Sequence, residues 1–340
     1  MHSPRTARVD PDALRTSALG EGIVQIRLPM RGNPLRYVNA YAIDEGADGL
    51  SLVDCGWRAG DVRAALDEGL SAFGATLQDI RRIFITHFHF DHYGLAATLM
   101  REGVRELLMH VRDWETVAGI FADPDASERA SDAWLARNGY DVPPASDDPY
   151  RRLGELIKPT AFVEDGCAYG RLEAVFTPGH SPGHVCFHDA KTGRLLSGDH
   201  ILDPVTPHVG LWFEGRGDPL GEYVGSLHKV ARLGASGVLP AHGEPFDDLT
   251  RRTDELLAHQ ERRESAILAA LASGPLSACE IARILTWTRR DLAFDGLDDM
   301  HQQFAVAETL AHLEYALARG LVARDSAQQP IVYRRSAHGS

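Results

Sequence analysis

Cysteine is scarce in this chain of 340 residues. The four cysteines are far apart in the sequence and none belongs to a C-x-x-C pair. This spacing opposes a disulfide framework and a thiolate metal site, and it favours reduced cysteines that pack in the interior. The residues concerned are Cys55, Cys167, Cys186 and Cys279.

Long apolar runs are also missing. Charged residues interrupt each run well before the roughly 18 residues that a membrane-spanning helix needs. The first residues, MHSPRTARVDPDALRTS, lack the apolar core of a signal peptide. We therefore expect no membrane association and a cytoplasmic location.

Positive charge is in deficit, with 35 Lys and Arg against 48 Asp and Glu and a net charge of -13. Because Lys and Arg dominate binding to phosphate backbones and anionic membranes, this balance opposes nucleic acid as a partner. A local cationic site is still compatible with it. The hydrophobic content of 44% is ample for a packed core, and the length favours one large and one small domain.

Strand and helix signals alternate along most of the chain, which favours a layered α/β architecture. One helix is expected over residues 59–74, with Asp61 as a candidate N-cap, and another over 219–234. The expected strands cover residues 22–30, 36–43, 50–56, 81–87, 172–180, 184–190, 193–202 and 237–243.

The pattern divides the chain into domains. Residues 1–17 are expected to be disordered, and residues 18–260 to form the large domain. Within it, 111–160 has the pattern of helices broken by Pro- and Asp-rich loops, which is typical of a lid. After a charged helix the strand signals nearly vanish, and 261–335 has the order of two or three helices and a terminal hairpin. This order predicts a small helical domain with a wing.

Histidine and aspartate gather where expected strands end. The stretch THFHFDHYGL follows the apolar run RRIFI and contains the pattern H-x-H-x-D-H, while FTPGH, LLSGDH and LPAHG each end a later strand. Because loops at the carboxyl ends of strands build the sites of α/β proteins, we expect these positions to converge on one cleft. The candidate ligands are His87, His89, Asp91, His92, His180, Asp199 and His242.

Imidazole and carboxylate are good ligands for zinc, and seven of them are too many for one tetrahedral ion but suit two. Two zinc ions that share a carboxylate can hold a bridging hydroxide as nucleophile. Two ions, two aspartates and one hydroxide leave a small positive charge, which attracts carbonyl oxygens, carboxylates or phosphates. Packing alone explains the pattern poorly, since polar groups at the end of a buried strand need partners.

The other histidines are expected to have different roles. His184 and His200 are candidates for orienting the ligands from behind. The remaining ones are predicted to be ordinary surface or core residues, namely His110, His188, His208, His228, His259, His301 and His312.

The motifs resemble those of the metallo-β-lactamase-fold hydrolase superfamily, over roughly residues 20 to 260. The resemblance implies an αββα sandwich, and it implies a second-layer role for Asp54, beside which Cys55 replaces the commoner threonine. His89 stands where the iron-binding branch generally has Glu, which favours zinc. The implied ligand sets are His87, His89 and His180 for the first metal, Asp91, His92 and His242 for the second, and Asp199 for both.

A narrower resemblance extends over almost the whole chain. RYVNAYAI, LLSGDHIL, TPH, DPLGEYVGSL, LPAHGEPF and the helix with HQERR are similar to the subgroup typified by β-lactamase-like protein 2. Its members carry a C-terminal winged-helix-like domain and include proteins described as ribonucleases. Here the chain from Arg262 onward has nine arginines, no lysine and nine acidic residues, which opposes DNA reading and favours a structural, lid or dimerisation role.

The leading hypothesis is a dinuclear zinc-dependent hydrolase that attacks a thioester, ester or lactone carbonyl of a small molecule. Asp91 is its candidate catalytic residue, and either Asp91 or a metal-bound water relays the proton to the leaving group. The alternatives are a metal-dependent ribonuclease or phosphodiesterase, and a non-catalytic winged-helix regulator; a homodimer is left open. Aromatic residues either line an acyl pocket or belong to the core, namely Trp114, Phe121, Trp134, Tyr140, Trp212 and Phe213.

Overall fold

The computed structural model describes residues 16–143, 155–215, 217–288 and 291–336. Within them, the larger sheet has the strand order β1-β2-β3-β4-β5-β6-β7. The pairs from β1 to β4 are antiparallel, and those from β4 to β7 are parallel. The strands are β1 (Ser17–Gly20), β2 (Ile23–Pro29), β3 (Tyr37–Asp44), β4 (Leu50–Val53), β5 (Ile80–Phe84), β6 (Glu106–Met109) and β7 (Ala161–Phe162).

The second sheet has the order β12-β11-β10-β9-β8, in which only the described pair β11 and β12 is parallel. Its strands are β8 (Ala168–Tyr169), β9 (Leu172–Phe176), β10 (Val185–Asp189), β11 (Arg194–Gly198) and β12 (Gly237–Pro240). Tyr41 and Phe84 from the first sheet share a buried cluster with Phe187 and Leu239 from the second. The two sheets therefore pack face to face, and burial of these side chains drives their association.

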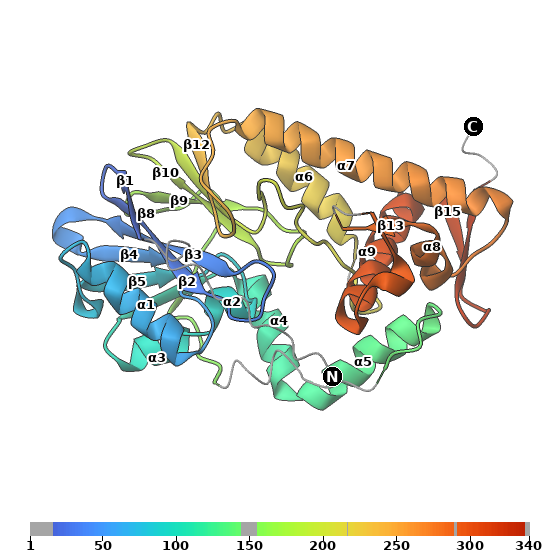
Figure 1. Cartoon of the computed structure of the whole chain (residues 1–340), viewed down its shortest axis with the longest axis horizontal. Helices are drawn as coiled ribbons and strands as arrows, with labels where there is room; N and C mark the ends of the chain where they lie inside the picture. The colour runs from blue at the N-terminus through green and yellow to red at the C-terminus, as the bar shows by residue number, and fades with distance from the viewer. Residues whose placement is uncertain (1–15, 144–154, 216, 289–290, 337–340) are drawn as a thin grey trace, which may run out of the picture.

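Helices cover the outer faces of both sheets (Figure 1). Val62 of α1 (Gly60–Ser71) and Leu99 of α3 (Ala96–Arg101) pack with strands of the larger sheet, near the short α2 (Phe90–Tyr93). Leu227 of α6 (Pro219–Ala231) and Leu256 of α7 (Leu249–Ala270) pack with the second sheet. These layers confirm the expected αββα sandwich.

The candidate N-cap at Asp61 is wrong. The N-cap residue of α1 is Ala59, and Asp61 lies in the first turn of the helix, where its carboxylate pairs with Arg31. A carboxylate inside the first turn still interacts favourably with the helix dipole. Asp61 therefore marks the start of the helix, two residues after the true N-cap.

The region expected to form a lid contains α4 (Val111–Ala122) and α5 (Pro124–Arg137), and its residues 144–154 lie outside the described residues. Trp134 and Tyr140 are buried in the cluster that joins α5 to the C-terminal helices. The Trp134 indole donates a hydrogen bond to the Leu211 carbonyl at 3.2 Å. These two aromatic residues therefore belong to the core and not to a substrate pocket.

The C-terminal part is mainly helical and packs closely on the sandwich (Figure 1). The predicted boundary between residues 260 and 261 lies inside α7, and Leu310 of α9 shares a core cluster with Leu227 of α6. The elements are α8 (Ala278–Ile284), β13 (Thr286–Trp287), β14 (Leu292–Ala293), α9 (Asp299–Ala318), β15 (Val322–Asp325) and β16 (Val332–Arg335). Short 3-10 turns occupy η2 (Gly46–Asp48), η3 (Leu77–Asp79), η5 (Leu271–Ser273) and η6 (Phe294–Gly296).

Other predictions from the sequence have mixed outcomes. All four cysteines are free, and three are buried as expected, but Cys167 is exposed. It lies just before β8, where a turn leaves little cover for its side chain. The segment 1–17 falls mostly outside the described residues, and Ser17 begins β1. No described helix has the length and apolarity to cross a membrane.

Candidate metal centre

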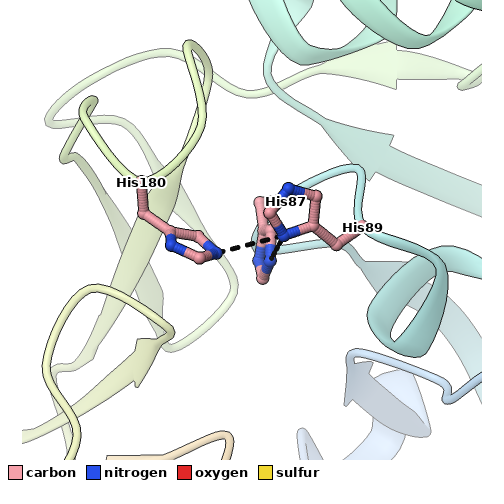
Figure 2. Close-up of side chains that lie close together, drawn as sticks. All are labelled: His87, His89 and His180. Carbon is pink, nitrogen blue, oxygen red and sulfur yellow. Dashed lines mark hydrogen bonds between the residues drawn. The ribbon is translucent and has the colours of Figure 1, made fainter. Parts of the chain in front are cut away.

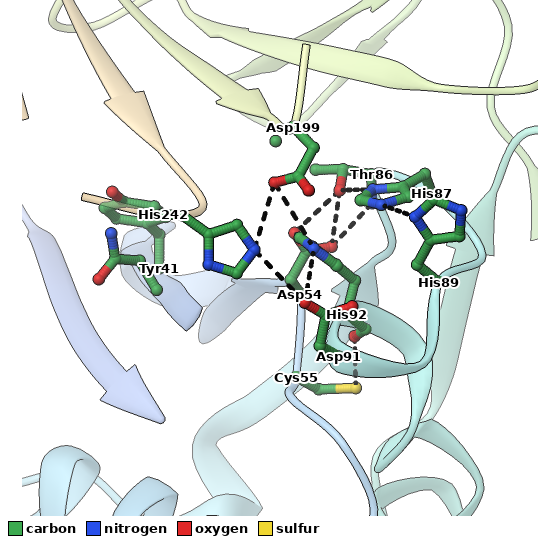
Figure 3. Close-up of polar contacts among 12 residues, drawn as sticks. Tyr41, Asp54, Cys55, Thr86, His87, His89, Asp91, His92, Asp199 and His242 are labelled. Atoms are coloured by element: carbon green, nitrogen blue, oxygen red, sulfur yellow. Dashed lines mark hydrogen bonds and ion pairs between the residues drawn. The ribbon is translucent and has the colours of Figure 1, made fainter. Parts of the chain in front are cut away.

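The seven predicted ligands lie close together, although they come from four separate segments (Figures 2 and 3). His87 and His89 follow β5, and Asp91 and His92 lie in α2. The other three follow strands of the second sheet, namely His180 after β9, Asp199 after β11 and His242 after β12.

A first cluster contains three histidines (Figure 2). The Nδ1 atom of His89 lies 2.9 Å from the Nε2 atom of His87 and 3.1 Å from the Nε2 atom of His180. Burial, with the nearby histidines, lowers the pKa of His87 well below its ordinary value, and burial and His180 lower the pKa of His89 to about 3. These imidazoles are therefore neutral at pH 7 and carry lone pairs that point at a common centre.

A second cluster contains Asp91, His92 and His242 (Figure 3). The Oδ2 atom of Asp91 lies 3.3 Å from the Nε2 atom of His242 and 3.6 Å from the Nε2 atom of His92. All three residues are buried.

Asp199 lies between the two clusters and faces both. Its Oδ1 atom lies 3.5 Å from the Nε2 atom of His242 and 3.7 Å from that of His92. Its Oδ2 atom lies 3.6 Å from the Nε2 atom of His180. One carboxylate oxygen is thus directed at each cluster, which is the arrangement that a residue shared by two ions requires.

Bonds on the far side of two rings fix which nitrogen faces inward. The Nδ1 atom of His180 is 2.7 Å from the His208 carbonyl oxygen, and that of His242 is 2.9 Å from the Tyr37 carbonyl oxygen. Because a carbonyl only accepts, each Nδ1 carries the proton and each Nε2 keeps its lone pair for the cluster.

Asp54 supports both clusters from behind (Figure 3). Its Oδ2 atom accepts a hydrogen bond from Nδ1 of His92 at 2.7 Å, and Oδ1 accepts from the Thr86 amide at 2.8 Å. The Thr86 hydroxyl lies 2.9 Å from Asp54 Oδ2 and 3.0 Å from Nδ1 of His87. Cys55 holds the same helical turn, since its thiol and its amide both donate to the His92 carbonyl. Asp54 therefore orients His92 directly and His87 through Thr86.

Of the two histidines predicted to orient ligands, one does so. His184 accepts a hydrogen bond at Nε2 from the Asp199 amide at 3.2 Å, and its Nδ1 lies 2.9 Å from the Thr177 hydroxyl. His200 instead packs against the ring of Tyr223, with 5.1 Å between the ring centroids. Within the described residues, both of its ring nitrogens are buried without a hydrogen-bond partner.

Asp113 is a residue of this centre that the sequence did not reveal. It lies in the first turn of α4, is fully buried, and binds the segments that carry His87 and His180. Burial raises the pKa of its carboxyl to about 7. An aspartate in the first turn of a helix is usually exposed and serves the helix dipole, so no local pattern distinguishes this one.

The sequence model of the family described as "Metallo-beta-lactamase superfamily" matches residues 33–242, and these residues include all seven predicted ligands. The chain belongs to the metallo-β-lactamase superfamily. A second family model, described as "Metallo-beta-lactamase-like, C-terminal domain", matches residues 265–336. The recognition of both parts from the sequence motifs is confirmed.

Relatives within this superfamily cover most of the chain. The probable metallo-hydrolase YqjP of Bacillus subtilis is 25% identical, over 86% of this chain and 92% of its own length. The atrochrysone carboxyl ACP thioesterase of Aspergillus fumigatus is 26% identical, over 78% of this chain and 70% of its own. The crystal structure of the metallo-beta-lactamase family protein TTHA1429 from Thermus thermophilus is 34% identical, with a TM-score of 0.78 over 94% of this chain and all of that one.

The residues present fit the metal chemistry of the superfamily. Nε2 of His92, Oδ1 of Asp199 and Nε2 of His242 are buried, and across the part of the chain that the structure describes they make ion-pair contacts with one another and with Asp91 at 3.3–3.7 Å but no hydrogen bond of normal geometry. Burial opposes charge on His92, but Asp91, Asp54 and Asp199 together raise its pKa well above the ordinary value. Carboxylates that favour a proton on this buried ring also favour a metal cation in its place. The centre could therefore hold divalent metal ions.

Proposed function

We propose that this protein is a dinuclear zinc-dependent hydrolase that cleaves a thioester, ester or lactone carbonyl. The observation that carries the proposal is the placement of Asp199, which faces the three-histidine cluster with one oxygen and the second cluster with the other. In this proposal Asp199 is shared, and nitrogen ligands in both clusters favour zinc over magnesium or calcium. His87, His89 and His180 would hold the first zinc, and Asp91, His92 and His242 would hold the second.

Two zinc ions, when bound, supply a water molecule acidified to a nucleophile at neutral pH and a positive charge that polarises the substrate carbonyl. The chain supplies the geometry. His87 and His92 are fully buried and fixed by Thr86 and Asp54, so their ring nitrogens need no rearrangement during the reaction. Asp91 lies in the second cluster, with Oδ2 3.3 Å from Nε2 of His242. We assign it the proton transfer from the attacking water to the departing thiolate or alkoxide.

The substrate class is the finer part of the proposal. A thioester ranks first because one relative is named as an acyl-carrier-protein thioesterase. Aromatic side chains also surround His208, the residue that holds His180. His208, whose carbonyl holds His180, stacks on Phe304 of α9 with 4.7 Å between ring centroids, and Trp212 meets Phe304 edge-on at 5.3 Å. Phe304 is 36% exposed, and we propose that its free face contacts an apolar acyl group.

Phe304→Ala is expected to raise KM for an aromatic or long-chain acyl thioester roughly fivefold, because about 1 kcal/mol of apolar contact is lost. The value of kcat is expected to change little. Steady-state kinetics give KM for a long-chain thioester and for an acetyl thioester. Only the KM for the long-chain thioester should rise in the variant. Phe73→Ala is the control, since Phe73 is similarly exposed, at 41%, and lies just beyond α1. Equal KM changes in both variants would contradict the assignment.

A substrate screen on zinc-loaded protein tests the proposed function. Thioesters, lactones and phosphodiesters, including single-stranded RNA, are compared before and after removal of metal by a chelator. We expect hydrolysis of a thioester, ester or lactone, about two zinc ions per chain by elemental analysis, and loss of activity without metal. Full activity in metal-free protein would defeat the mechanism. RNA cleavage lost in His92→Ala would put the nuclease alternative first, and salt-sensitive DNA binding without any turnover would favour the regulator.

A further inference from the structure

A buried carboxylate joins the two segments that hold the three-histidine cluster. Oδ2 of Asp113 accepts hydrogen bonds from the Phe88 amide at 2.9 Å and from the Ser181 hydroxyl at 2.8 Å. Oδ1 accepts from the Gly183 amide at 2.5 Å. Phe88 lies between His87 and His89 in the sequence, and Ser181 follows His180 directly. One side chain thus contacts the chain on both sides of the cluster.

The contact is close enough to restrict the backbone itself. A Cβ atom at Gly183 would lie 2.4 Å from the Asp113 amide nitrogen and 2.8 Å from the Asp113 Cβ atom. Only glycine fits there, so the loop after His180 is pressed against the start of α4. The helix start is held in turn by His110, whose Nδ1 atom accepts from the Arg112 amide at 3.2 Å.

We propose that Asp113 is a positioning residue that sets the separation of His180 from the His87 and His89 pair. This inference rests on the proposed function, since it concerns the affinity of the first zinc site. Asp113 touches none of the seven candidate ligands by any hydrogen bond of the described residues, and it acts through the backbone of the loops that carry them. If the two loops separated, the three ring nitrogens would no longer face one centre.

Asparagine is the sharpest replacement, because it keeps the shape of the side chain but has one acceptor oxygen. The two carboxylate oxygens together receive three donors. An amide nitrogen in either position would therefore face a backbone N–H, and one of the two loops would lose its backbone hydrogen bond to this side chain. Ser181→Ala is a milder variant that removes one donor and leaves both backbone bonds in place.

The test is a competition titration of zinc against a chromophoric chelator, with the visible spectrum of cobalt-loaded protein as a second readout. Asp113→Asn is expected to lower the zinc affinity of one site about tenfold and to leave the affinity of the other within about threefold of the wild-type value. It is also expected to shift the cobalt spectrum. Ser181→Ala is expected to act in the same direction with a smaller loss. Should Asp113→Asn fail to fold, Ser181→Ala decides the matter by itself.

Asp189→Asn is the matched control. Asp189 is also fully buried and accepts from Arg171 and Thr192, away from the centre. The Asp189→Asn substitution is expected to lower the melting temperature without changing the zinc affinity. The inference is overturned if folded Asp113→Asn or Ser181→Ala binds both zinc ions with wild-type affinity. It is also overturned if Asp189→Asn lowers the zinc affinity as much as Asp113→Asn does. Wild-type protein that binds no zinc would instead overturn the proposed function, so the two failures are distinguishable.

Discussion

Asp199→Ala is expected to lower the zinc content from two ions to about one per chain and to reduce kcat for the screened substrate by roughly 10²–10³-fold. Asp199 faces both clusters, at 3.6 Å from Nε2 of His180 and 3.5 Å from Nε2 of His242. Its removal takes a ligand from both proposed sites and one negative charge from the space between them. The second cluster should lose its ion first, because it would retain two histidines and only one carboxylate.

Elemental analysis after gel filtration measures the zinc content, and kinetics at saturating substrate measure kcat. Asp189→Ala is the control for the loss of a buried carboxylate outside the centre, and it should retain two ions. Wild-type zinc content and rate in Asp199→Ala would eliminate the shared role of this residue and with it the main support for the proposed function.

Asp54→Asn is expected to lower the zinc affinity of the second cluster about 10–100-fold and to lower kcat by a comparable factor. Oδ2 of Asp54 keeps the proton of His92 on Nδ1, and Oδ1 binds the Thr86 amide. An asparagine has one acceptor, so it satisfies only one of these donors. If its amide nitrogen faces His92, the imidazole must carry its proton on Nε2 instead, and that nitrogen can no longer bind a metal ion.

The effect of Asp54→Asn should appear in zinc affinity more than in folding. Competition titration measures the affinity, and thermal melting of metal-free protein measures the stability. Cys55→Ala is the neighbouring control, because it removes only the thiol bond to the His92 carbonyl, 3.2 Å long, and keeps the amide bond to the same oxygen. A wild-type zinc affinity in Asp54→Asn would show that the ring of His92 is held by other contacts.

In the proposed function, the C-terminal part contributes to substrate choice and supplies none of the metal ligands. None of the seven candidate ligands comes from it, whereas Phe304 of α9 stacks on His208, whose carbonyl holds His180. α9 also shares its core with α6 and α7, so it is fixed relative to the sandwich. In the proposed function, relatives that differ in α9 would keep the same chemistry and select different acyl groups.

The long elements were predictable from the sequence, and the very short ones were not. Alternating or continuous apolar residues marked β2, β3 and β5, because each buries a face or both faces of a strand. The strands β7, β8, β13 and β14 have two residues each, which is too short for any period to be visible. They exist because a neighbouring strand offers hydrogen bonds, and that neighbour is distant in the sequence or lies across a turn.

The sequence by itself determined which side chains gather at the centre, because a buried strand that ends in several titratable groups requires partners for them. Only the tertiary structure decided how they are held. The carbonyls of His208 and Tyr37 orient His180 and His242, and a backbone carbonyl has no signature in a sequence. Asp113 looked like an ordinary residue of a helix start, and its contact with both ligand loops arises only when α4 packs against them.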